Sequence, residues 1–295
     1  MKEILDGKIV AQEIKEDLYD RATKAGVHPR LAIISVGENP ASEIYMKHKI
    51  IDCDECGFDT TVYHLDESVE TVELIQMISR LNYNDTIHGI IVQLPLPKHV
   101  DQYLVTSSIS MGKDVDCMNP TNLGKLMLGK NPPLLPCTPA GVIALLDRYG
   151  IDVAGKVCTI IGRSNIVGKP LGLKAQGLAI KLLQLGGSGL HGDATVIHCH
   201  SKSPDLWNKT RAANIVISAT GVPNLIVPMM LNVGTIGIDI GISRGDDGKV
   251  HGDFDPRSWS YCNYITPVPG GVGPMTRAML MKNLLMACEP KCFED

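Results

Sequence analysis

Aromatic side chains and excess positive charge, two features that nucleic-acid-binding surfaces rely on, are both scarce in this chain. Only 3 of the 295 residues are Phe and 2 are Trp, and 28 Lys and Arg are set against 32 Asp and Glu, for a net charge of −4. With few stacking rings and no basic field, little is available to hold bases or a phosphate backbone. We therefore expect no nucleic acid partner, and any anionic ligand must meet cations that are placed locally.

Long apolar runs are lacking as well. No stretch approaches the roughly 18 uninterrupted apolar residues of a membrane span. The opening MKEILDGKIVAQEIKEDLYD carries acidic residues where a targeting peptide has none. These two features predict a cytoplasmic protein with no membrane partner.

The nine cysteines are odd in number and scattered, and a chain of this size does not need disulfides to hold its core. We therefore predict reduced thiols. The C-x-x-C pair Cys53/Cys56 and the helical pair Cys288/Cys292 do not have the spacing of a zinc ribbon. No metal site is predicted.

The first half of the chain alternates between helical and strand patterns. Apolar residues recur at helical spacing between Gly7 and Gly26, and strands are expected over 30–37, 60–65 and 87–94, with helices from about Pro40 and over 69–81 between them. Alternation at this period implies βαβ units and a parallel sheet.

The stretch GKNPPLLPCTPAG separates this half from a second series, with strands expected over 156–162, 194–200, 214–221 and 235–242 and a final helix over 275–286. A chain of this length usually forms about two domains. We predict an α/β fold of two doubly wound parallel-sheet domains, the second Rossmann-like, with a cleft between them. The first spans 1–145 and is completed by a C-terminal helix at 272–295; the second spans 146–271.

The first strand of the second domain ends in GRSNIVG, from Gly162 to Gly168, and a helix-forming stretch follows. Glycine in such a turn lets the backbone approach a diphosphate, and the amides at the helix start bind its negative charge. The pattern differs from G-x-G-x-x-G, so by itself it also fits a plain turn. Its position after the first strand favours a dinucleotide site.

The end of the second strand indicates which dinucleotide is bound. NAD enzymes usually carry an acidic residue there, whereas this chain has His200, Ser201 and Lys202. Without a carboxylate, and with Arg163 in the preceding turn, the pocket accepts a ribose phosphate, so NADP is favoured over NAD. The alternative is that Lys202 is only a solvated surface charge.

In the first domain, Tyr45 and Lys49 are four residues apart on the helix from Pro40 and share one face. Such a pair is usually half-buried with its charged head in water. Two neighbours favour a ligand site instead, because Gln93 ends a strand where open α/β sheets bind ligands and Asp116 lies in the loop beyond. The glycines and prolines of PVPGGVGPMT at 267–276 predict a rigid turn. Its backbone either comes close to a ligand or forms a structural crossover between domains.

Seven blocks occur in one order along nearly the whole chain. They are A-S-x-x-Y-x-x-x-K at 41–49, V-Q-L-P-L-P at 92–97, K-D-V-D at 113–116, P-C-T-P-x-G at 136–141, G-R-S-x-x-V-G at 162–168, C-H-S at 199–201 and P-V-P-G-G-V-G-P-M-T at 267–276. Together they resemble the methylenetetrahydrofolate dehydrogenase/cyclohydrolase family. The resemblance implies a homodimer of one-carbon metabolism that oxidises methylene-tetrahydrofolate with NADP and hydrolyses the methenyl product to formyl-tetrahydrofolate.

The resemblance also implies roles for individual residues. Lys49 is the catalytic lysine, Tyr45 stacks on the folate, Gln93 hydrogen-bonds and tunes Lys49, and Asp116 holds the amino edge of the pterin. The further positions implied to bind the folate are Val92, Leu94, Pro269, Gly270, Gly271, Val272 and Gly273. The positions implied to bind the cofactor are Gly162, Arg163, Ser164, Val167, Gly168, His200, Ser201, Lys202, Thr220, Gly221, Ile242, Gly273 and Thr276.

The chain departs from the family pattern at two places. The link between Pro170 and Ala194 is longer than usual, and a loop near the cofactor and an extended helix at a subunit face both remain possible for its extra residues, about 184–193. Cys117 stands where a glycine usually follows K-D-V-D, which leaves the conformation of the loop carrying Asp116 open.

Two other functions remain possible at this point. One is a dehydrogenase that has lost cyclohydrolase activity and is possibly NAD-linked. The other is a non-catalytic nucleotide-binding module, in which the set formed by Tyr45, Lys49, Gln93 and Asp116 has no purpose.

Overall fold

Two parallel sheets organise the chain, and each forms the centre of a separate unit in the computed structural model, which describes residues 3–128, 130, 134–175, 193–245 and 248–293. The small-sheet unit comprises Gln12–Lys125, Pro132–Cys137 and Arg277–Asp295. The large-sheet unit comprises Met1–Ala11, Leu126–Asn131 and Thr138–Thr276.

This division differs from the expected boundary at residue 145 at both ends of the first domain. The N-terminal strand β1 (Glu3–Ile4) pairs with β11 (Cys262–Ile265) of the large sheet. Helix α6 (Cys137–Arg148) places Val142, Ile143 and Leu146 against strands of the same sheet. Residues 1–11 and 138–145 therefore pack with the large sheet.

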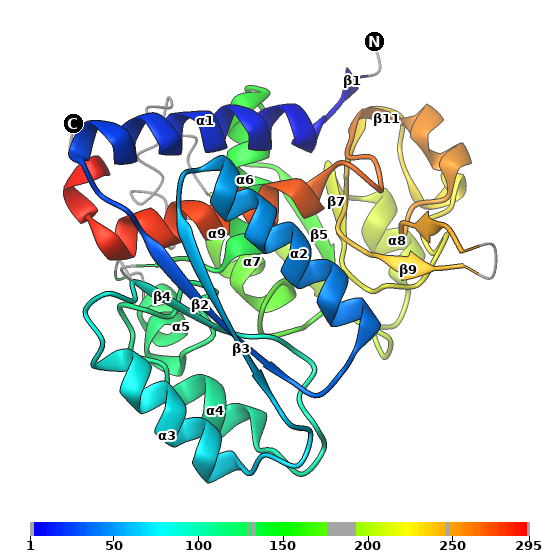
Figure 1. The fold of residues 1–295 in the computed structure, drawn as a ribbon. Helices are drawn as coiled ribbons and strands as arrows, with labels where there is room; N and C mark the ends of the chain where they lie inside the picture. The colour runs from blue at the N-terminus through cyan, green and yellow to red at the C-terminus, as the bar shows by residue number, and fades with distance from the viewer. Residues whose placement is uncertain (1–2, 129, 131–133, 176–192, 246–247, 294–295) are drawn as a thin grey trace. The chain divides into compact units, whose positions relative to one another are not determined.

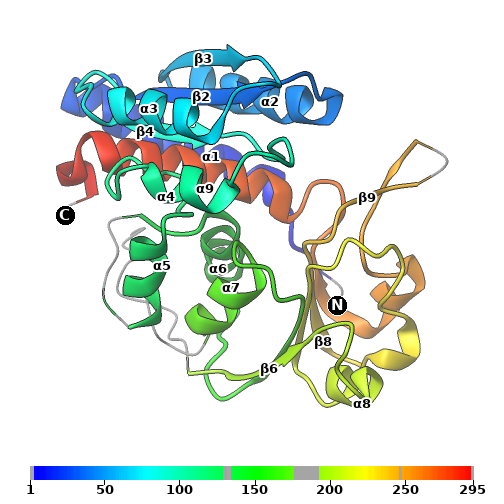
Figure 2. The ribbon, with the colours of Figure 1, turned by 90° about the horizontal axis from the view of Figure 1, so that it is seen from below.

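The small sheet has three parallel strands in the order β3-β2-β4, namely β3 (Asp59–Leu65), β2 (Arg30–Val36) and β4 (Gly89–Val92). Helices α2 (Pro40–Glu55) and α3 (Thr71–Asn82) connect them and lie on opposite faces (Figures 1 and 2). The three expected strands and two expected helices are confirmed. Because β3 and β4 flank β2, the strand order reverses at the carboxyl ends of β2 and β4, where such sheets bind ligands.

Alternation along β2 supplies the core of this unit. Ala32, Ile34 and Val36 point to the face covered by α3 and α4 (Gln102–Ser108), and their neighbours in sequence point to the other face. A capping box between Glu70 and Glu73 satisfies backbone amides where α3 begins. The buried partners in or next to α3, β4 and α4 are Leu74, Ile78, Leu81, Ile87, Ile90, Val92, Val100, Val105 and Ile109.

The C-terminal half of α9 (Val272–Cys288) lies against β4. A Cβ atom added to Gly89 would be 2.7 Å from Leu284 Cδ1 of α9 and 2.7 Å from Val115 Cγ1. Such distances are below normal carbon contact, so the strand accepts the helix this closely because residue 89 has no side chain. Helices α1 (Gly7–Ala25) and α5 (Pro120–Met127) complete the helical elements of the first half.

The large sheet has six parallel strands in the order β1-β11-β8-β7-β5-β6. The four expected strands are confirmed as β5 (Val157–Ile161), β6 (Thr195–Cys199), β7 (Ile215–Ser218) and β8 (Thr235–Asp239). Counted from β5, the five strands that this half contributes to the large sheet, β5 to β8 and β11, follow the doubly wound order 2-1-3-4-5. The order reverses between β5 and β7, so the ligand end of this sheet is the carboxyl end of those two strands.

Helices cover both faces of the large sheet. Figure 2 shows α6 and α7 (Gly168–Ala175) on one side of its strands and α8 (Leu206–Arg211) on the other. Shorter elements follow, namely η2 (Pro228–Met230), the hairpin β9 (Ser243–Arg244) and β10 (Val250–His251), η3 (Pro256–Tyr261) and η4 (Pro290–Phe293). Most of the long link noted above, residues 176–192, lies outside the described residues.

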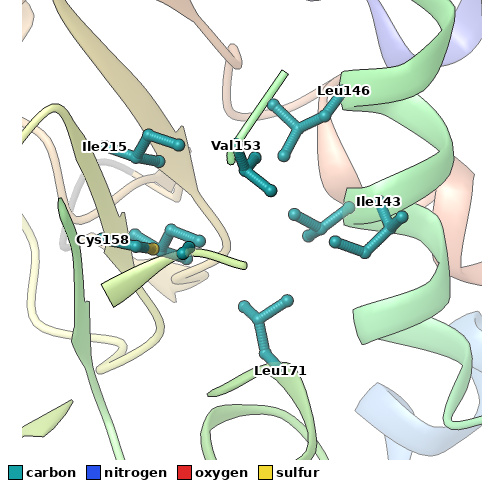
Figure 3. A pocket seen from close by; sticks show the side chains of 9 residues that line it. Ile143, Leu146, Val153, Cys158, Leu171 and Ile215 are labelled. Atoms are coloured by element: carbon teal, nitrogen blue, oxygen red, sulfur yellow. The ribbon is translucent and has the colours of Figure 1, made fainter. Parts of the chain in front are cut away.

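A small apolar hollow lies between α6, α7 and the large sheet (Figure 3). Its lining exposes no polar surface, so it offers nothing that would hold a charged ligand. The lining residues are Val142, Ile143, Leu146, Val153, Cys158, Leu171, Ala194, Ile215 and Ile217.

Neither a membrane span nor a metal cluster occurs among the described residues. No helix there combines the length and the apolar composition needed to cross a bilayer. No group of three or more His, Cys, Asp or Glu side chains is arranged to hold an ion there. None of the nine cysteines, all of which are among the described residues, forms a disulfide, and seven of them are buried.

Candidate active site

Helix α2 begins at the ligand end of the small sheet. The Asn39 side chain accepts a hydrogen bond from the Ser42 amide at 3.2 Å, which caps the helix. The Ser42 hydroxyl donates to the Leu94 carbonyl at 3.4 Å, just beyond β4. The first turn of α2 is thereby tied to the strand end that carries Gln93.

Lys49 and Gln93 meet at this point. Lys49 Nζ donates to Gln93 Oε1 at 3.0 Å. Gln93 is itself held by two further bonds, because its Nε2 donates to the Leu94 carbonyl at 2.9 Å and its backbone amide donates to the Ile34 carbonyl at 2.8 Å. The lysine amine therefore has a defined position, and the ring of Tyr45 one turn earlier is half exposed and open to stacking.

The two acidic residues of the K-D-V-D block have different surroundings. Asp114 is fully buried and accepts hydrogen bonds from the Met118 amide at 3.0 Å, the Asn119 amide at 2.7 Å and Asn122 Nδ2 at 3.1 Å. These hydrogen bonds lower the pKa of Asp114, but burial outweighs them and raises it to about 6. Asp114 holds the loop in shape, and Asp116 is partly exposed and faces solvent with part of its surface.

Asp116 and Lys49 lie near the same buried thiol, Cys137. Burial raises the pKa of Cys137 well above its ordinary value, the charge of Asp116 raises it further, and the charge of Lys49 opposes the shift. Both charged groups therefore lie within electrostatic reach of one point in the small-sheet unit. Of the four residues expected as a set, Lys49 and Gln93 are joined by a hydrogen bond, Asp116 acts on the same thiol as Lys49, and Tyr45 lies one turn before Lys49 on α2.

Cys117 keeps the backbone conformation that a glycine would adopt. Its φ of 56° lies in the left-handed region, at a cost of about 1 kcal/mol or more for a residue with a Cβ atom. Its side chain is buried, and Sγ donates to the Leu134 carbonyl at 3.3 Å. The substitution therefore leaves the turn after Asp116 in a glycine-type conformation, which answers the question raised by the sequence.

At the ligand end of the large sheet, glycines bring three segments together. Gly162 has φ 127°, and a Cβ atom there would lie 2.7 Å from the Ala219 carbonyl oxygen at the end of β7. A Cβ atom on Gly168 would overlap the Gly162 backbone, and one on Gly172 would overlap the His198 ring. Gly172 was missed from the sequence, although a third glycine on the helix face is the expected signal for close helix packing.

Polar groups surround this glycine turn. The Ser164 hydroxyl accepts from the amides of Val167 at 3.2 Å and Gly168 at 3.4 Å at the start of α7. After β6, the His200 amide donates to Ser203 Oγ at 3.0 Å and the Lys202 amide donates to His200 Nδ1 at 3.1 Å. The side chains of Arg163, Ser201 and Lys202 are exposed next to these turns.

Two buried carboxylates shape the ends of β7 and β8, and the sequence reasoning missed both. Asp253 is fully buried, and its Oδ2 accepts from Ser218 Oγ at 2.6 Å, the Thr220 amide at 2.8 Å and Thr220 Oγ1 at 2.8 Å. Asp239 accepts from the amides of Asp253 and Phe254, each at 2.9 Å. The signal in the sequence was an acidic residue ending an apolar strand. Together these carboxylates hold the segment that begins with Thr220 and Gly221.

Burial makes Asp239 a source of pH dependence. It raises the pKa of this carboxyl to about 7, and the charge of Asp253 adds to the shift. The folded state then favours the protonated form, so the contribution to stability is fully present below about pH 4 and is lost as the pH rises through about 7. At roughly 1.4 kcal/mol per pKa unit, the loss is of the order of a few kcal/mol.

We expect Asp239→Asn, which stays uncharged, to remove this loss of stability between about pH 4 and pH 7. Urea unfolding followed by tryptophan fluorescence measures it, because both tryptophans, Trp207 and Trp259, lie in the large-sheet unit. The control is Asp152→Asn, an exposed position in the same unit. Wild-type and Asp239→Asn curves that run parallel across this range would contradict the expectation.

Exposed apolar side chains follow three adjacent strands of the large sheet. Ile166 after β5, Val222 after β7 and Ile242 after β8 are 46%, 49% and 48% exposed. Exposed aliphatic groups at a strand-end turn are suited to contact with a flat ring. Only Ile242 was expected from the sequence; Ile166 and Val222 carry no signal without the fold that places them beside it.

The turn before α9 is a close backbone crossing. Gly270 has φ 109°, and the Gly271 amide donates to the Pro267 carbonyl at 2.8 Å. A Cβ atom on Gly7 would overlap Gly271. Pro269 and Gly273 are exposed, whereas Gly270, Gly271 and Val272 are buried, and Thr276 Oγ1 lies 3.0 Å from Thr138 Oγ1. For part of this segment, the close crossing of two backbone stretches is therefore reason enough for the glycines, as in the structural alternative.

Two family models cover most of the chain. Residues 5–116 match the catalytic domain of tetrahydrofolate dehydrogenase/cyclohydrolase, and residues 136–292 match the NAD(P)-binding domain of the same family. The chain belongs to the tetrahydrofolate dehydrogenase/cyclohydrolase family. The two matches fall on the two halves of the chain, and the last helix is matched with the second half, whereas the sequence analysis assigned it to the first domain.

Relatives of this family resemble the chain over its full length. The bifunctional protein FolD of Campylobacter jejuni is 46% identical over 290 residues, which are 97% of this chain and 98% of the relative. A crystal structure of the FolD dehydrogenase/cyclohydrolase from Campylobacter jejuni has a TM-score of 0.92 at 43% identity and covers 99% of this chain and all of its own. A Trypanosoma brucei FolD structure complexed with NADP cofactor and inhibitor has a TM-score of 0.87 at 33% identity, with 98% of each chain covered.

Proposed function

We propose that the chain is a bifunctional enzyme that oxidises methylene-tetrahydrofolate with NADP and hydrolyses the methenyl product to formyl-tetrahydrofolate. The observation that supports it most is the hydrogen bond between Lys49 and Gln93 at the ligand end of the small sheet. A nucleotide-binding module would have no use for an amine held in this way. FolD relatives with bifunctional names support the same function.

We assign folate binding and hydrolysis to the domain expected at 1–145 with the helix at 272–295. Lys49 is the catalytic amine, and Gln93 orients it because its Oε1 accepts a hydrogen bond from Lys49 Nζ. In its neutral form, the amine takes a proton from water while the water oxygen bonds to the methenyl carbon. Tyr45 stacks on the folate, Asp116 accepts hydrogen bonds from the pterin amino edge, and Val92 and Leu94 border the site, with Pro269–Gly273 as a further border.

We assign NADP binding to the domain expected at 146–271, and the residues present fit this cofactor. Gly162 and Gly168 leave backbone space that a Cβ atom would fill, which suits the close approach of a diphosphate. The exposed cations Arg163 and Lys202 suit a ribose phosphate. When bound, NADP accepts a hydride from the methylene carbon. The remaining proposed contacts are Ser164, Val167, His200, Ser201, Thr220, Gly221, Ile242, Gly273 and Thr276.

We further propose that the enzyme is a cytoplasmic homodimer. Nine cysteines that form no disulfide suit a reducing compartment. Family resemblance supports the dimer, and β3 is an edge strand that pairs with β2 alone in the described sheet, so its outer side is open to another chain. Light scattering of the purified protein tests it, and a monomer mass at micromolar concentration would contradict it.

The proposed function is tested by one pair of assays on the purified chain. The absorbance of the reduced cofactor is followed with methylene-tetrahydrofolate and either NADP or NAD, and hydrolysis of methenyl-tetrahydrofolate is followed separately without cofactor. We expect NADP-linked reduction together with hydrolysis. Reduction without hydrolysis would favour a dehydrogenase alone, faster reduction with NAD would overturn the cofactor assignment, and cofactor binding without either reaction would favour a binding module.

A further inference from the structure

One buried carboxylate on α2 has no part in the site described so far. Asp52 is 2% exposed, whereas Tyr45 on the same helix is 50% exposed. Tyr45, Lys49 and Asp52 occupy positions i, i+4 and i+7, so they share one face of α2. The face that presents the site residues to solvent therefore continues inward to a buried charge.

Two cations from two other helices contact Asp52, one on each oxygen. Lys15 Nζ of α1 lies 3.1 Å from Oδ1, and Arg277 Nε of α9 lies 3.2 Å from Oδ2. All three residues belong to the small-sheet unit. The carboxylate thus ties α2 to two helices in different directions, which opposes both sliding of α2 and rotation about its axis.

The charges of this cluster are suited to a fixed contact. The desolvation of Lys15 lowers its pKa, but the hydrogen bonds that its amine donates to Glu55 and Asp52, together with their charges, outweigh this and leave the pKa raised, so the amine stays protonated. Buried ion pairs hold their geometry when each charge is paired and lose it when one partner is removed. Lys15 also pairs with Glu55, one turn further along α2, whose side chain is 42% exposed and is not on the face of Lys49.

We propose that Asp52 is a positioning residue for Lys49. By fixing the rotation of α2, its contacts with Lys15 and Arg277 determine where Lys49 Nζ meets Gln93 Oε1. Lys49 lies three residues, or about 4.5 Å along the axis, from this anchor. A misplacement of about 1 Å in a catalytic group costs up to about 10²-fold in rate. The inference rests on the catalytic role proposed for Lys49.

The test compares Asp52→Asn with Glu55→Gln, a matched change that removes the other carboxylate partner of Lys15 but leaves Arg277 and the Lys49 face untouched. We expect Asp52→Asn to lower the cyclohydrolase kcat at least about tenfold, with the KM for NADP unchanged and the dehydrogenase kcat within about threefold. Glu55→Gln should keep both kcat values within about twofold. Asp52→Glu, which restores the charge, should recover part of the lost cyclohydrolase kcat.

A second variant covers the case in which Asp52→Asn fails to fold because Arg277 is left unpaired. The double variant Asp52→Asn/Arg277→Gln removes both charges, and circular dichroism checks its fold. Its cyclohydrolase kcat should fall by the factor expected for the single variant, because the ion pair between Asp52 of α2 and Arg277 of α9 is absent from both.

Three outcomes would overturn the inference, and they are distinguishable. Wild-type hydrolysis in the folded double variant shows that the tie does not position Lys49. An equal loss of both activities, with a raised KM for NADP, shows a general structural role instead. Lys49→Met is measured alongside: if it retains hydrolysis, the proposed role of Lys49 fails as well, whereas if it loses hydrolysis, only the role of Asp52 is in question.

Discussion

Replacing Lys49 by methionine is expected to reduce hydrolysis of methenyl-tetrahydrofolate by about 10² to 10⁴-fold, the range that general acid–base groups contribute. The amine that Gln93 Oε1 holds at 3.0 Å is the group proposed to take the proton of the attacking water. Methionine has a similar length but accepts no proton at this position. Hydride transfer to NADP needs no proton from this group, so the dehydrogenase activity should stay within about tenfold of wild type.

The measurement is kcat and KM for each activity in the same preparation. The matched control is Lys47→Met, which removes an exposed lysine two residues away on another face of α2. It should leave both activities within about twofold of wild type. Equal retention of both activities in Lys49→Met would remove Lys49 from the mechanism, and equal loss would indicate that Lys49 serves mainly to bind the folate.

The second large effect is expected at the other sheet, where Gly162→Ala should lower kcat/KM for NADP by about 10²-fold. A residue with a Cβ atom at φ 127° is strained by about 1–3 kcal/mol. The added Cβ also lies 2.7 Å from the Ala219 carbonyl oxygen, which is backbone and cannot turn aside. Relief requires the turn between β5 and α7 to move, and each 1.4 kcal/mol lost in binding is tenfold in affinity.

Hydrolysis assayed without cofactor should survive in Gly162→Ala, because Lys49, Gln93 and Asp116 belong to the small-sheet unit. The control is Gly155→Ala, also a positive-φ glycine of the large-sheet unit, with φ 67° and no atom within 4 Å of the added Cβ. It carries the strain without the overlap, so NADP kinetics should be unchanged. Parallel losses in the two variants, or loss of hydrolysis in Gly162→Ala, would contradict this account.

These two predictions are reciprocal. One variant should lose hydrolysis and keep cofactor-linked oxidation, and the other should do the reverse. A chain in which every perturbation lowered both activities together would instead have a single indivisible site.

Local patterns in the sequence were enough to predict the strands and the glycine turn. β-branched runs bounded by glycine and proline became β2 to β8 with shifts of a few residues at their ends. Lys49 and Gln93 were grouped in one candidate ligand site because one follows from helical spacing and the other from the position of a strand end, whereas their hydrogen bond was implied by the family resemblance. Both rules depend only on neighbours along the chain.

Burial, in contrast, depends on segments that are distant in sequence. Asp114 and Asp116 are two residues apart and look alike in the sequence, but three hydrogen bonds from residues 118–122 make the first structural. Asp253 has a role only because Ser218 and Thr220 come to it from another strand. The boundary at 145 shifted for the same reason, since β1 and α6 pack on the sheet of the second half.

The sequence by itself determined the alternation of strands and helices, the parallel sheets, the family and the chemical kinds of side chain available. Periodicity and glycine placement are local properties, and they survive whatever the rest of the chain does. Only the tertiary structure decided which of these side chains are held, by what and at which distance. Asp52 illustrates the reason: an aspartate on a helix is usually a solvated charge, and it became a buried anchor because Lys15 and Arg277, 37 residues before it and 225 after it, converge on its two oxygens.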